Sequence, residues 1–456
     1  MEQVLGQVRR GRTGVRLAGR GPAGRRGVRT GAGAVVAALG LLAALPGAAG
    51  AAGTPQPVPS YRGADGAKAV EGKPSTAGSP LLEPGSLYKD SIAPGERYYR
   101  LYLDDRSTMY VSGVLQPPVG AKVAYGDGVE VEVVNTENHY CPGNPGRGSF
   151  GYDAVPVSAV GFRMLREDSG CQQPGTYYVK VTRTASKGAD QAAWPLELRV
   201  QREPGLGGGS APTTAPSVWP SASPTLPGTD PAPRTGGSGF NDARALGSGV
   251  WSDELRPGQT RYYRVPLDWG QQLGLGAELS AGKMTKEYGS ASSGLSVSLY
   301  SPYRGLVDNE DATYDGKQAS VTLPRTAPVA YENRFSSDRK VEPVRVAGWY
   351  YVSVTMAKKV GEFTEDAAPV PLTLRLEVIG AAGKAPAYAE GLAAGGFGVG
   401  TEDRAAAKEG TTALEAADAA ENRSVMRVVA GAGFGTGTLL LLVLGGWILL
   451  SRRRPS

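Results

Sequence analysis

The stretch PGERYYRLYLD at residues 94–104 returns, with one residue inserted, as PGQTRYYRVPLD at residues 257–268. The offset between matching blocks drifts only from 163 to 176 residues along the chain. Three further blocks recur in the same order: GVEVEV at 128–133 as GLSVSL at 294–299, GTYYVKVT at 175–182 as GWYYVSVT at 348–355, and PLELR at 195–199 as PLTLR at 371–375. Four ordered blocks indicate two copies of one domain, which we place at residues 81–202 and 240–379.

The repeated blocks have the period of β-strands. Apolar and charged residues alternate through residues 129–133, which predicts a strand with one buried and one solvated face. The same alternation gives the other long blocks one apolar face each: Tyr99, Leu101 and Leu103, matched by Tyr263, Val265 and Leu267, and Tyr177, Val179 and Val181, matched by Tyr350, Val352 and Val354. Short strands divided by Gly, Pro, Asn and Asp turns predict an all-β chain with an antiparallel β-sandwich in each copy.

The order of these blocks resembles the bacterial pre-peptidase C-terminal domain. The second copy carries an opening Asn241-Asp242, a Pro-Gly turn and the strands YYRV, LSVSLY and AGWYYVSV, whereas the first copy lacks the Asn-Asp. The resemblance implies two tandem jelly-roll-like sandwiches, of a kind found beside secreted proteases and in other exported proteins. Some family members are calcium-dependent collagen-binding modules, but a full set of matching acidic ligands and a protease domain are both missing from this sequence. The Ala, Gly and Arg bias is similar to that of actinobacterial proteins.

Residues 1–51 predict a secretory signal. Residues 1–30 hold eight arginines against one glutamate, a small apolar run follows at 31–45, and small residues occupy 48–52. The pairs Arg9-Arg10 and Arg25-Arg26 raise the alternative of a twin-arginine signal, but no apolar pair follows either of them. We therefore expect ordinary export of the chain.

Residues 428–450 predict a single transmembrane helix. The segment has 23 residues without a charge, and at 1.5 Å per residue it spans about 34 Å against a hydrocarbon core of about 30 Å. Three arginines follow at 452–454, so positive charge places the tail 451–456 in the cytoplasm and the bulk of the chain outside, as in a single-pass type I protein of the cell membrane. A cell-wall sorting signal is the alternative, but no Leu-Pro-x-Thr-Gly pentapeptide stands just upstream.

Glycines inside this segment suggest a partner for the helix. Two overlapping Gly-x-x-x-Gly pairs would let a second helix approach closely, which predicts a homodimer or docking to another membrane protein. The alternative is chance, since glycine is abundant throughout the chain. The pairs are Gly431 with Gly435 and Gly433 with Gly437.

The charge of the chain argues against nucleic acid as a partner. The formal net charge is +6, but residues 1–51 contribute +7 and the last three arginines +3, so the remainder carries −4. The excess of positive charge therefore belongs to the targeting segments, and it does not indicate a surface that binds the phosphates of a nucleic acid.

Three segments of biased composition divide the exported part. Residues 52–80, 203–239 and 380–427 are rich in Gly, Ala, Pro, Ser, Thr or Glu, and they hold too few large apolar residues to be expected to fold. We expect a disordered segment, a linker that leaves the two domains free of one another, and a stalk. The alanines of residues 403–421 favour a weak helix without an apolar face.

Both cysteines lie in the first copy. Cys141 and Cys171 are exported together, which predicts a disulfide closing a loop of roughly 30 residues, with a metal-thiolate or redox pair as the alternative. The second copy lacks both, so the bridge tethers a loop specific to the first. That loop, with His139, Tyr140 and Arg147, is a candidate binding surface, and the simpler alternative is a stapled loop.

The acidic stretch DNEDATYDG at residues 308–316 imitates the first half of a calcium loop. Its candidate ligands are Asp308, Glu310, Asp311 and Asp315. The glutamate expected at the twelfth position is replaced by Thr322, and a hairpin turn at Asp315-Gly316 explains the same letters. We therefore expect no cofactor, with calcium as the alternative.

Catalytic motifs are scarce. His139 is the only histidine, so a His-Glu-x-x-His zinc site is impossible, and no serine lies in a Gly-x-Ser-x-Gly turn. We expect a non-enzymatic, membrane-anchored cell-surface protein that presents two β-sandwich modules to an extracellular protein or an envelope glycan. The alternative is an accessory extracellular subunit of a membrane-bound exported enzyme or secretion complex.

Overall fold

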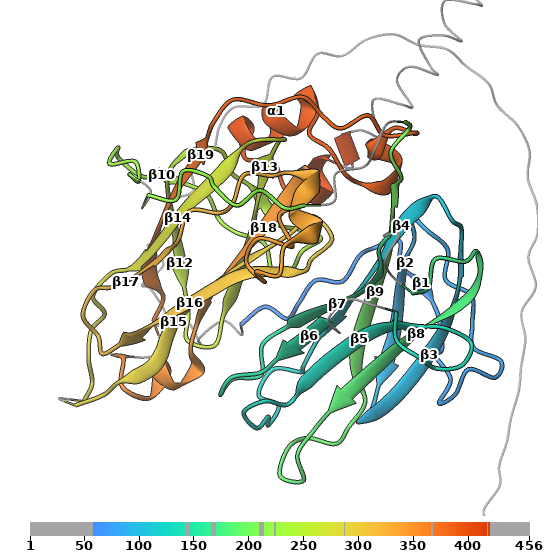
Figure 1. Cartoon of the computed structure of the whole chain (residues 1–456). Coiled ribbons are helices and arrows are strands. Elements are labelled where there is room, and N and C mark those ends of the chain that lie inside the picture. The colour runs from blue at the N-terminus through green and yellow to red at the C-terminus, as the bar shows by residue number, and fades with distance from the viewer. Residues whose placement is uncertain are drawn as a thin grey trace, which may run out of the picture. The chain divides into compact units, whose positions relative to one another are not determined.

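The first copy folds into a β-sandwich of two sheets (Figure 1). Its strands are β1 (Lys68–Ala69), β2 (Leu87–Ile92), β3 (Gly95–Leu103), β4 (Ser107–Leu115), β5 (Gly128–Val134), β6 (Gly146–Ser149), β7 (Val157–Arg163), β8 (Gly175–Thr184) and β9 (Trp194–Pro204). One sheet has the order β1-β2-β9-β4-β7 and the other β3-β8-β5-β6. Every pair is antiparallel except β1 with β2.

The second copy repeats this topology strand for strand. Its strands are β10 (Ala232–Pro233), β11 (Arg244–Ala245), β12 (Gly249–Leu255), β13 (Thr260–Leu267), β14 (Gln272–Leu279), β15 (Ala291–Tyr300), β16 (Leu306–Tyr314), β17 (Ala319–Leu323), β18 (Gly348–Met356) and β19 (Val370–Ile379). The sheets are ordered β10-β12-β19-β14-β17 and β11-β13-β18-β15-β16, so β11 is the one addition. The predicted duplication and the two-sandwich fold are confirmed.

The computed structural model describes residues 58–141, 146–165, 170–208, 214–222, 225–286, 288–365, 368–416 and 418–419, all in one compact unit. The predicted signal at 1–51 lies outside these residues, as do the transmembrane segment at 428–450 with its glycines and the tail at 451–456. Within the described ranges, no helix has the length and apolar character needed to cross a membrane.

Strand alternation builds both cores as predicted. Tyr99, Leu101 and Leu103 of β3 are buried, and so are their counterparts on β13. The late blocks do the same on β8 and β18, where Val179 and Val352 have no exposed surface. Because side chains alternate across a strand, these positions fix which face of each sheet turns inward.

A contact between a tyrosine, an aspartate and a glycine recurs in both copies. Tyr99 Oη donates to Asp90 Oδ2 at 2.7 Å, and the Gly72 amide donates to the same oxygen at 2.7 Å. A side chain at Gly72 would not fit, since a Cβ there would lie 2.6 Å from the Tyr99 ring. The contact holds the segment before β2 onto the sandwich. The second copy repeats it with Tyr263, Asp253 and Gly236.

The three segments expected not to fold are ordered where the structure describes them. Residues 58–80 supply β1, the segment 225–239 supplies β10, and the last supplies the short helices η4 (Leu392–Gly395) and α1 (Thr401–Glu409). The short helices η1 (Tyr331–Phe335) and η2 (Lys358–Glu362) belong to the second sandwich. The prediction that these segments do not fold was wrong, because an average composition does not show that a single residue such as Phe397 is buried against the second core.

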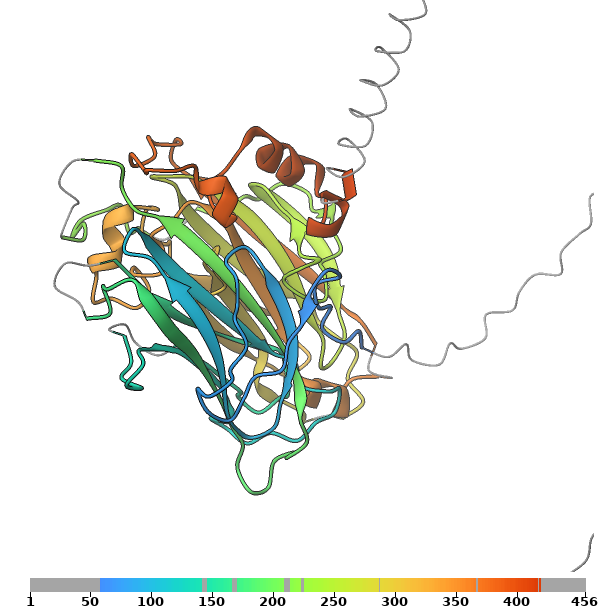
Figure 2. The same cartoon turned by 90° about the vertical axis from the view of Figure 1, so that its right-hand side faces the viewer.

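The described C-terminal segment, residues 380–416, contacts both sandwiches (Figure 2). The Gly207 amide donates to Ala387 O at 2.7 Å, and the Ala389 amide donates to Gly205 O at 2.9 Å, at the end of the first sandwich. Further on, the Ala245 amide of β11 donates to Thr411 O at 3.0 Å. The helix expected near residue 403 exists as α1, and it is docked: Ala407 is buried.

We expect Gly72→Ala to lower the free energy of unfolding by roughly 1 to 3 kcal/mol, because the new methyl group overlaps the buried Tyr99 ring. Gly66→Ala is the matched control, since nothing lies within 4 Å of its Cβ position. Urea unfolding of the three proteins measures the difference. Equal midpoints for both variants would contradict the role assigned to this contact.

Candidate functional site

The sheet β1-β2-β9-β4-β7 of the first sandwich packs against the sheet β11-β13-β18-β15-β16 of the second. Val114 of β4 lies in one buried cluster with Phe240, Ala243, Tyr262 and Tyr351 of the second copy. The core of the second sandwich also takes in Tyr110 and Val160 from the first. We call this contact surface the interface.

One buried ion pair of the interface joins Glu197 on β9 to Arg304. Arg304 Nη1 donates to Glu197 Oε1 at 2.6 Å, and both side chains are 2% exposed. Asn241 Nδ2 donates to both carboxylate oxygens at 3.0 and 2.9 Å, and the Ala64 amide donates to Oε2 at 2.8 Å. Burial alone would raise the pKa of Glu197, but the guanidinium and these hydrogen bonds hold that pKa below its ordinary value.

Arg304 has an unusual backbone. Its φ is 65°, in the left-handed region that residues other than glycine rarely adopt. Ser158 Oγ of the first sandwich donates to its carbonyl at 2.9 Å, and the Arg304 amide donates to Ser301 O at 2.8 Å. The surrounding contacts therefore fix a conformation that costs on the order of 1 to 3 kcal/mol elsewhere.

The second buried ion pair joins Glu203 on β9 to Arg334. Their Oε1 and Nη2 atoms are 2.6 Å apart, and each side chain is 1% exposed. Tyr110 Oη donates to Glu203 Oε2 at 2.6 Å and Tyr388 Oη donates to Oε1 at 2.8 Å, while the Tyr110 ring stacks on Tyr303 at 4.3 Å. Burial alone would raise the pKa of Glu203, but Arg334 and the tyrosine hydroxyls hold it below its ordinary value.

The prediction that the two domains are free of one another was wrong. It rested on the composition of residues 203–239, and linker composition carries no information on the surfaces that a linker joins. Parts of that segment also bind the second sandwich: Gln272 Nε2 donates to Pro220 O at 3.0 Å and Arg375 Nη1 donates to Pro227 O at 2.9 Å. The ion pairs require the two sheets to meet in one register.

The predicted disulfide is confirmed. Cys141 and Cys171 are bonded with their Cα atoms 5.5 Å apart, and they are 30 residues apart in sequence. Cys141 belongs to the first core. Both sulfur atoms are used in this bond, so neither is a thiolate that could bind a metal.

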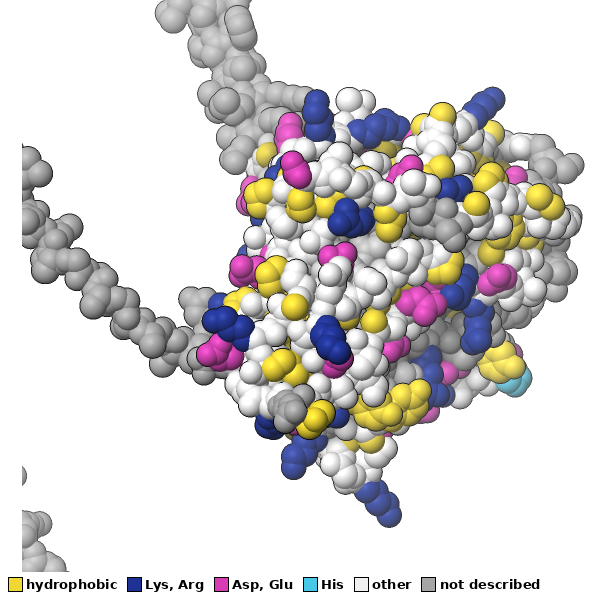
Figure 3. Space-filling view, turned by 90° about the vertical axis from the view of Figure 1, so that its left-hand side faces the viewer, with side chains coloured by type: hydrophobic (Ala, Val, Ile, Leu, Met, Phe, Trp, Pro, Cys, Tyr) yellow, Lys and Arg dark blue, Asp and Glu magenta, His cyan; other side chains and the backbone are white. Residues whose placement is uncertain are grey.

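The candidate residues of the disulfide loop are separated in the structure. His139 and Tyr140 are exposed between β5 and β6, and His139 is the single cyan side chain at the edge of the face shown in Figure 3. Arg147 lies on β6 and points toward the other end of β5, where its Nη2 donates to Gly126 O at 2.9 Å. These residues therefore do not form one site.

A pair of exposed tyrosines lies where Arg147 points. Tyr125 and Tyr152 are 76% and 78% exposed, and their ring centroids are 5.7 Å apart with the planes tilted by 41°. We call them the tyrosine pair. Sequence reasoning missed it, although each tyrosine stands in a turn-like stretch, Tyr125-Gly126-Asp127 and Gly151-Tyr152-Asp153. A large aromatic residue among turn residues was the available signal.

The loop that carries Tyr125 is held by Asp127. Its Oδ2 accepts from the Ala124 amide at 2.9 Å, and its Oδ1 accepts from the Ser186 amide at 2.9 Å and from Ser186 Oγ at 2.7 Å. Burial alone would raise the pKa of Asp127, but these hydrogen bonds lower it. The aspartate therefore stays ionised and keeps the loop in place.

The calcium candidates lie on a strand and its turn. Asp308, Glu310 and Asp311 are part of β16, where neighbouring side chains point to opposite faces, so they do not form the loop that the calcium alternative requires. Lys340 Nζ lies 2.6 Å from Asp308 Oδ1 and 3.7 Å from Glu310 Oε1. Asp315 begins the turn, with Gly316 at φ 85°. Within the described ranges, no three His, Cys, Asp or Glu residues are placed to hold a metal ion.

An open groove of about 400 Å³ lies beside the interface. Residues 63–67 form one wall, and Lys89 and Asp90 of β2 with Pro195 of β9 form the other. Asp90 already accepts from Tyr99 and Gly72, and none of the lining residues is aromatic. The groove therefore offers less for recognition than the tyrosine pair does.

No protein-family model and no curated protein matches the chain. Among solved structures, the pre-peptidase C-terminal domain of collagenase from Bacillus anthracis is 16% identical, covers 27% of this chain and 94% of that domain, and has a TM-score of 0.18. The N-terminal CBM22-1-CBM22-2 tandem domain of Xyn10C from Paenibacillus barcinonensis is 12% identical over 64% of this chain and 91% of that one, with a TM-score of 0.17. Part of the chain is thus similar to a pre-peptidase C-terminal domain.

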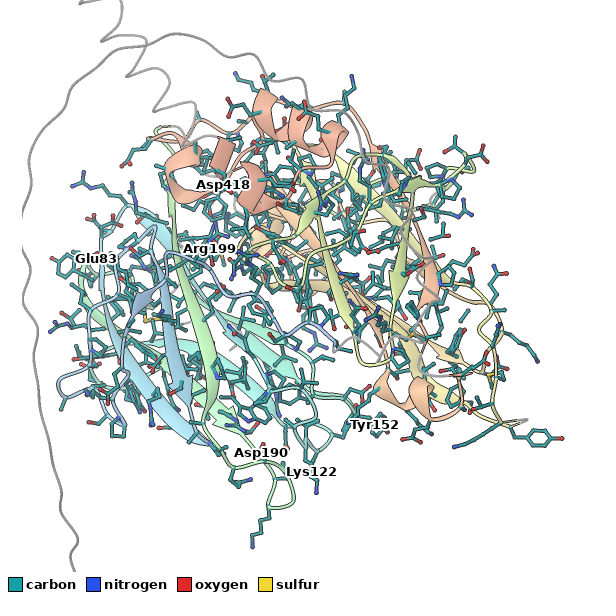
Figure 4. All side chains as sticks on the ribbon, turned by 180° about the vertical axis from the view of Figure 1, so that it is seen from behind. Glu83, Lys122, Tyr152, Asp190, Arg199 and Asp418 are labelled. Carbon is teal, nitrogen blue, oxygen red and sulfur yellow. A yellow bond between two sulfur atoms is a disulfide. The ribbon has the colours of Figure 1, made fainter. Side chains whose placement is uncertain are left out.

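We expect Glu203→Gln to lower the free energy of unfolding by about 3 to 5 kcal/mol, because it leaves Arg334 buried without its counter-charge. Glu83→Gln is the control, since Glu83 pairs with Lys68 at the surface (Figure 4). Urea unfolding followed by tryptophan fluorescence reports both. A loss no larger than that of Glu83→Gln would show that the interface does not depend on this pair.

The same pair predicts a pH dependence. Because the pKa of Glu203 in the folded protein lies below the ordinary glutamate value of about 4.3, its contribution is complete above that pH and is lost as the pH falls through the folded-state pKa. Below about pH 4.3 we therefore expect stability to fall more steeply for the wild type than for Glu203→Gln. Urea titrations between about pH 7 and pH 3 measure both slopes, and parallel curves would refute the expectation.

Proposed function

We propose that the chain is a non-enzymatic, membrane-anchored cell-surface protein that presents its two β-sandwiches as one rigid binding arm on the extracellular side. The observation that carries the proposal is the interface, together with the C-terminal segment that contacts both sandwiches. Two buried ion pairs make sliding of one sandwich over the other costly, since each shift leaves an unpaired charge.

The described chain comes to its end on the opposite side of the unit from the tyrosine pair. Figure 4 shows Asp418 at one end and Tyr152 at the other. Eight residues, 420–427, separate Ala419 from the predicted transmembrane segment, and fully extended they reach at most about 29 Å. This supports an arm that stands close to the membrane with its tyrosine pair directed away from the anchor.

The buried acids support a structural role rather than catalysis. Buried carboxylates with shifted pKa values, such as Glu197 and Glu203, are common in active sites. Here the oxygens of both accept hydrogen bonds from arginine, tyrosine or amide donors of the interface. The one histidine, His139, is exposed and its nearest acidic partner is Glu137, with Nδ1 and Oε2 4.0 Å apart. Neither arrangement pairs a nucleophile with a base.

The second candidate is an accessory extracellular subunit of a membrane-bound exported enzyme or secretion complex. The short reach of residues 420–427 favours it, because an arm held close to the membrane stands beside the extracellular parts of a neighbouring membrane protein. The predicted Gly-x-x-x-Gly pairs would supply contact within the membrane.

A comparison of the full chain with a chain lacking residues 428–456 tests the proposal. We expect the full chain in the membrane fraction and the shortened one in the medium, with the same envelope glycan or surface protein recovered by both in pull-downs read by mass spectrometry. Absence of the full chain from the membrane fraction would refute the proposed membrane anchor. A stoichiometric membrane partner recovered only with the full chain would replace the first candidate by the second.

A further inference from the structure

We propose that the tyrosine pair is a platform for a neutral β-linked oligosaccharide, whose sugar rings stack on Tyr125 and Tyr152. The inference rests on the proposed function in one respect, since it takes the arm to be a binding element. It adds the ligand class and the residues that hold it.

Both rings of the tyrosine pair are exposed. Burial of a large apolar side chain stabilises a protein by about 1.5 to 3 kcal/mol, and this chain buries tyrosines such as Tyr99, Tyr110 and Tyr263 completely. Tyr125 and Tyr152 lie side by side and lack this stabilisation, because more than three quarters of the surface of each side chain is exposed to water. Their faces are available to a ligand.

The two loops that carry the rings are held in position. The Gly126 amide donates to Phe150 O at 3.1 Å and the Phe150 amide donates to Asp127 O at 2.7 Å, so the two tyrosine loops are bonded to one another. Phe150 itself is buried in the first core, and Arg147 donates to Gly126 O. The backbone of both loops therefore has little conformational freedom to lose on binding, which favours affinity.

The chemistry of this surface indicates the class of ligand. A pyranose with equatorial substituents has an apolar C–H face that stacks on an aromatic ring and a rim of hydroxyls that bonds to polar groups. Arg147 donates to Gly126 O beside Tyr125, and Lys122 and Asp190 lie at the same end of the unit as Tyr152 in Figure 4. Because the charges are of both signs, the surface does not attract a polyanion. It is also not a deep, desolvated pocket of the kind that binds a protein partner.

The spacing agrees with a chain rather than a single sugar. Two rings whose centroids are 5.7 Å apart and whose planes tilt by 41° can each face one of two successive residues of a β-linked chain, in which neighbouring sugars turn relative to one another. The platform is specific to the first copy. Tyr125 lies three residues before Gly128. The residue at the matching position of the second copy, three residues before Gly294, is Ala291, and it is buried.

Calorimetric titration of the full chain with cellohexaose and with chitohexaose tests the proposal, in micelles of a detergent without a sugar headgroup. The two probes share the β-linkage and separate a glucan from an amino-sugar source. We expect saturable binding of at least one, weakened roughly tenfold or more by Tyr125→Ala and by Tyr152→Ala, and changed by less than about threefold in the corresponding Phe variants, which keep the ring. Maltohexaose, with α-linkages, should bind at least about tenfold more weakly.

Tyr102→Ala is the matched control, because Tyr102 is 66% exposed on the outer face of β3, away from the pair. We expect it to bind as the wild type does. Failure of both probes to bind, equal loss in Tyr102→Ala, or loss confined to Tyr140→Ala on the hairpin would each overturn the proposal. Thermal unfolding confirms that the variants are folded. The membrane fractionation described above fails or succeeds independently of sugar binding, so the two proposals are separately refutable.

Discussion

The ion pair between Glu203 and Arg334 is the interaction on which the arrangement of this protein most depends. A carboxylate and a guanidinium that are each 1% exposed have lost nearly all of their hydration, and only close pairing and further hydrogen bonds compensate for that loss. Tyr110 from the first sandwich and Tyr388 from the C-terminal segment supply those bonds. Three parts of the chain thus meet at one carboxylate. Any other docking of the two sandwiches would leave a buried charge without a partner.

Duplication produced two equal folds with unequal surfaces. The sheet that contains β13 in the second copy is covered by the first sandwich and by α1, so Tyr262 and Arg264 on its outer face are buried. The matching sheet of the first copy stays open: Arg100, the counterpart of Arg264, and Tyr102 are exposed on its outer face, although Tyr98, the counterpart of Tyr262, is buried. Because the interface joins different sheets of the two copies, it is heterologous, and each copy was free to change the residues of the face it used. Asn241, read from the sequence as a family motif, bonds to Glu197 across the interface.

The predictions that succeeded depend on local pattern, and those that failed depend on distant partners. Alternation along β3 and β8 is a property of a few successive residues, so the buried faces could be read directly. The partners of Glu197 and Asp308 could not be read that way, because Arg304 and Lys340 come from segments far along the chain or at its turns. Composition failed for the C-terminal segment because Tyr388 and Phe397 are too few to change an average, although each packs against the interface. The tyrosine pair was missed for a related reason: its two members are 27 residues apart and meet only through the hydrogen bonds of Gly126 and Phe150.

The C-terminal segment fixes the position of the described end of the chain relative to the two sandwiches. A flexible stalk would let the sandwiches sample many heights and orientations above their point of attachment. Here the segment is bonded to the end of β9 through Gly205 and Gly207 and to β11 through Ala245, so the point where the described chain ends is fixed relative to both sandwiches. The tyrosine pair lies at the far end of the same unit, on loops bonded to one another. A ligand on those tyrosines would therefore be held at a nearly constant distance from the point where the described chain ends. Breaking the interface would therefore alter the presentation of the site without touching any residue of it.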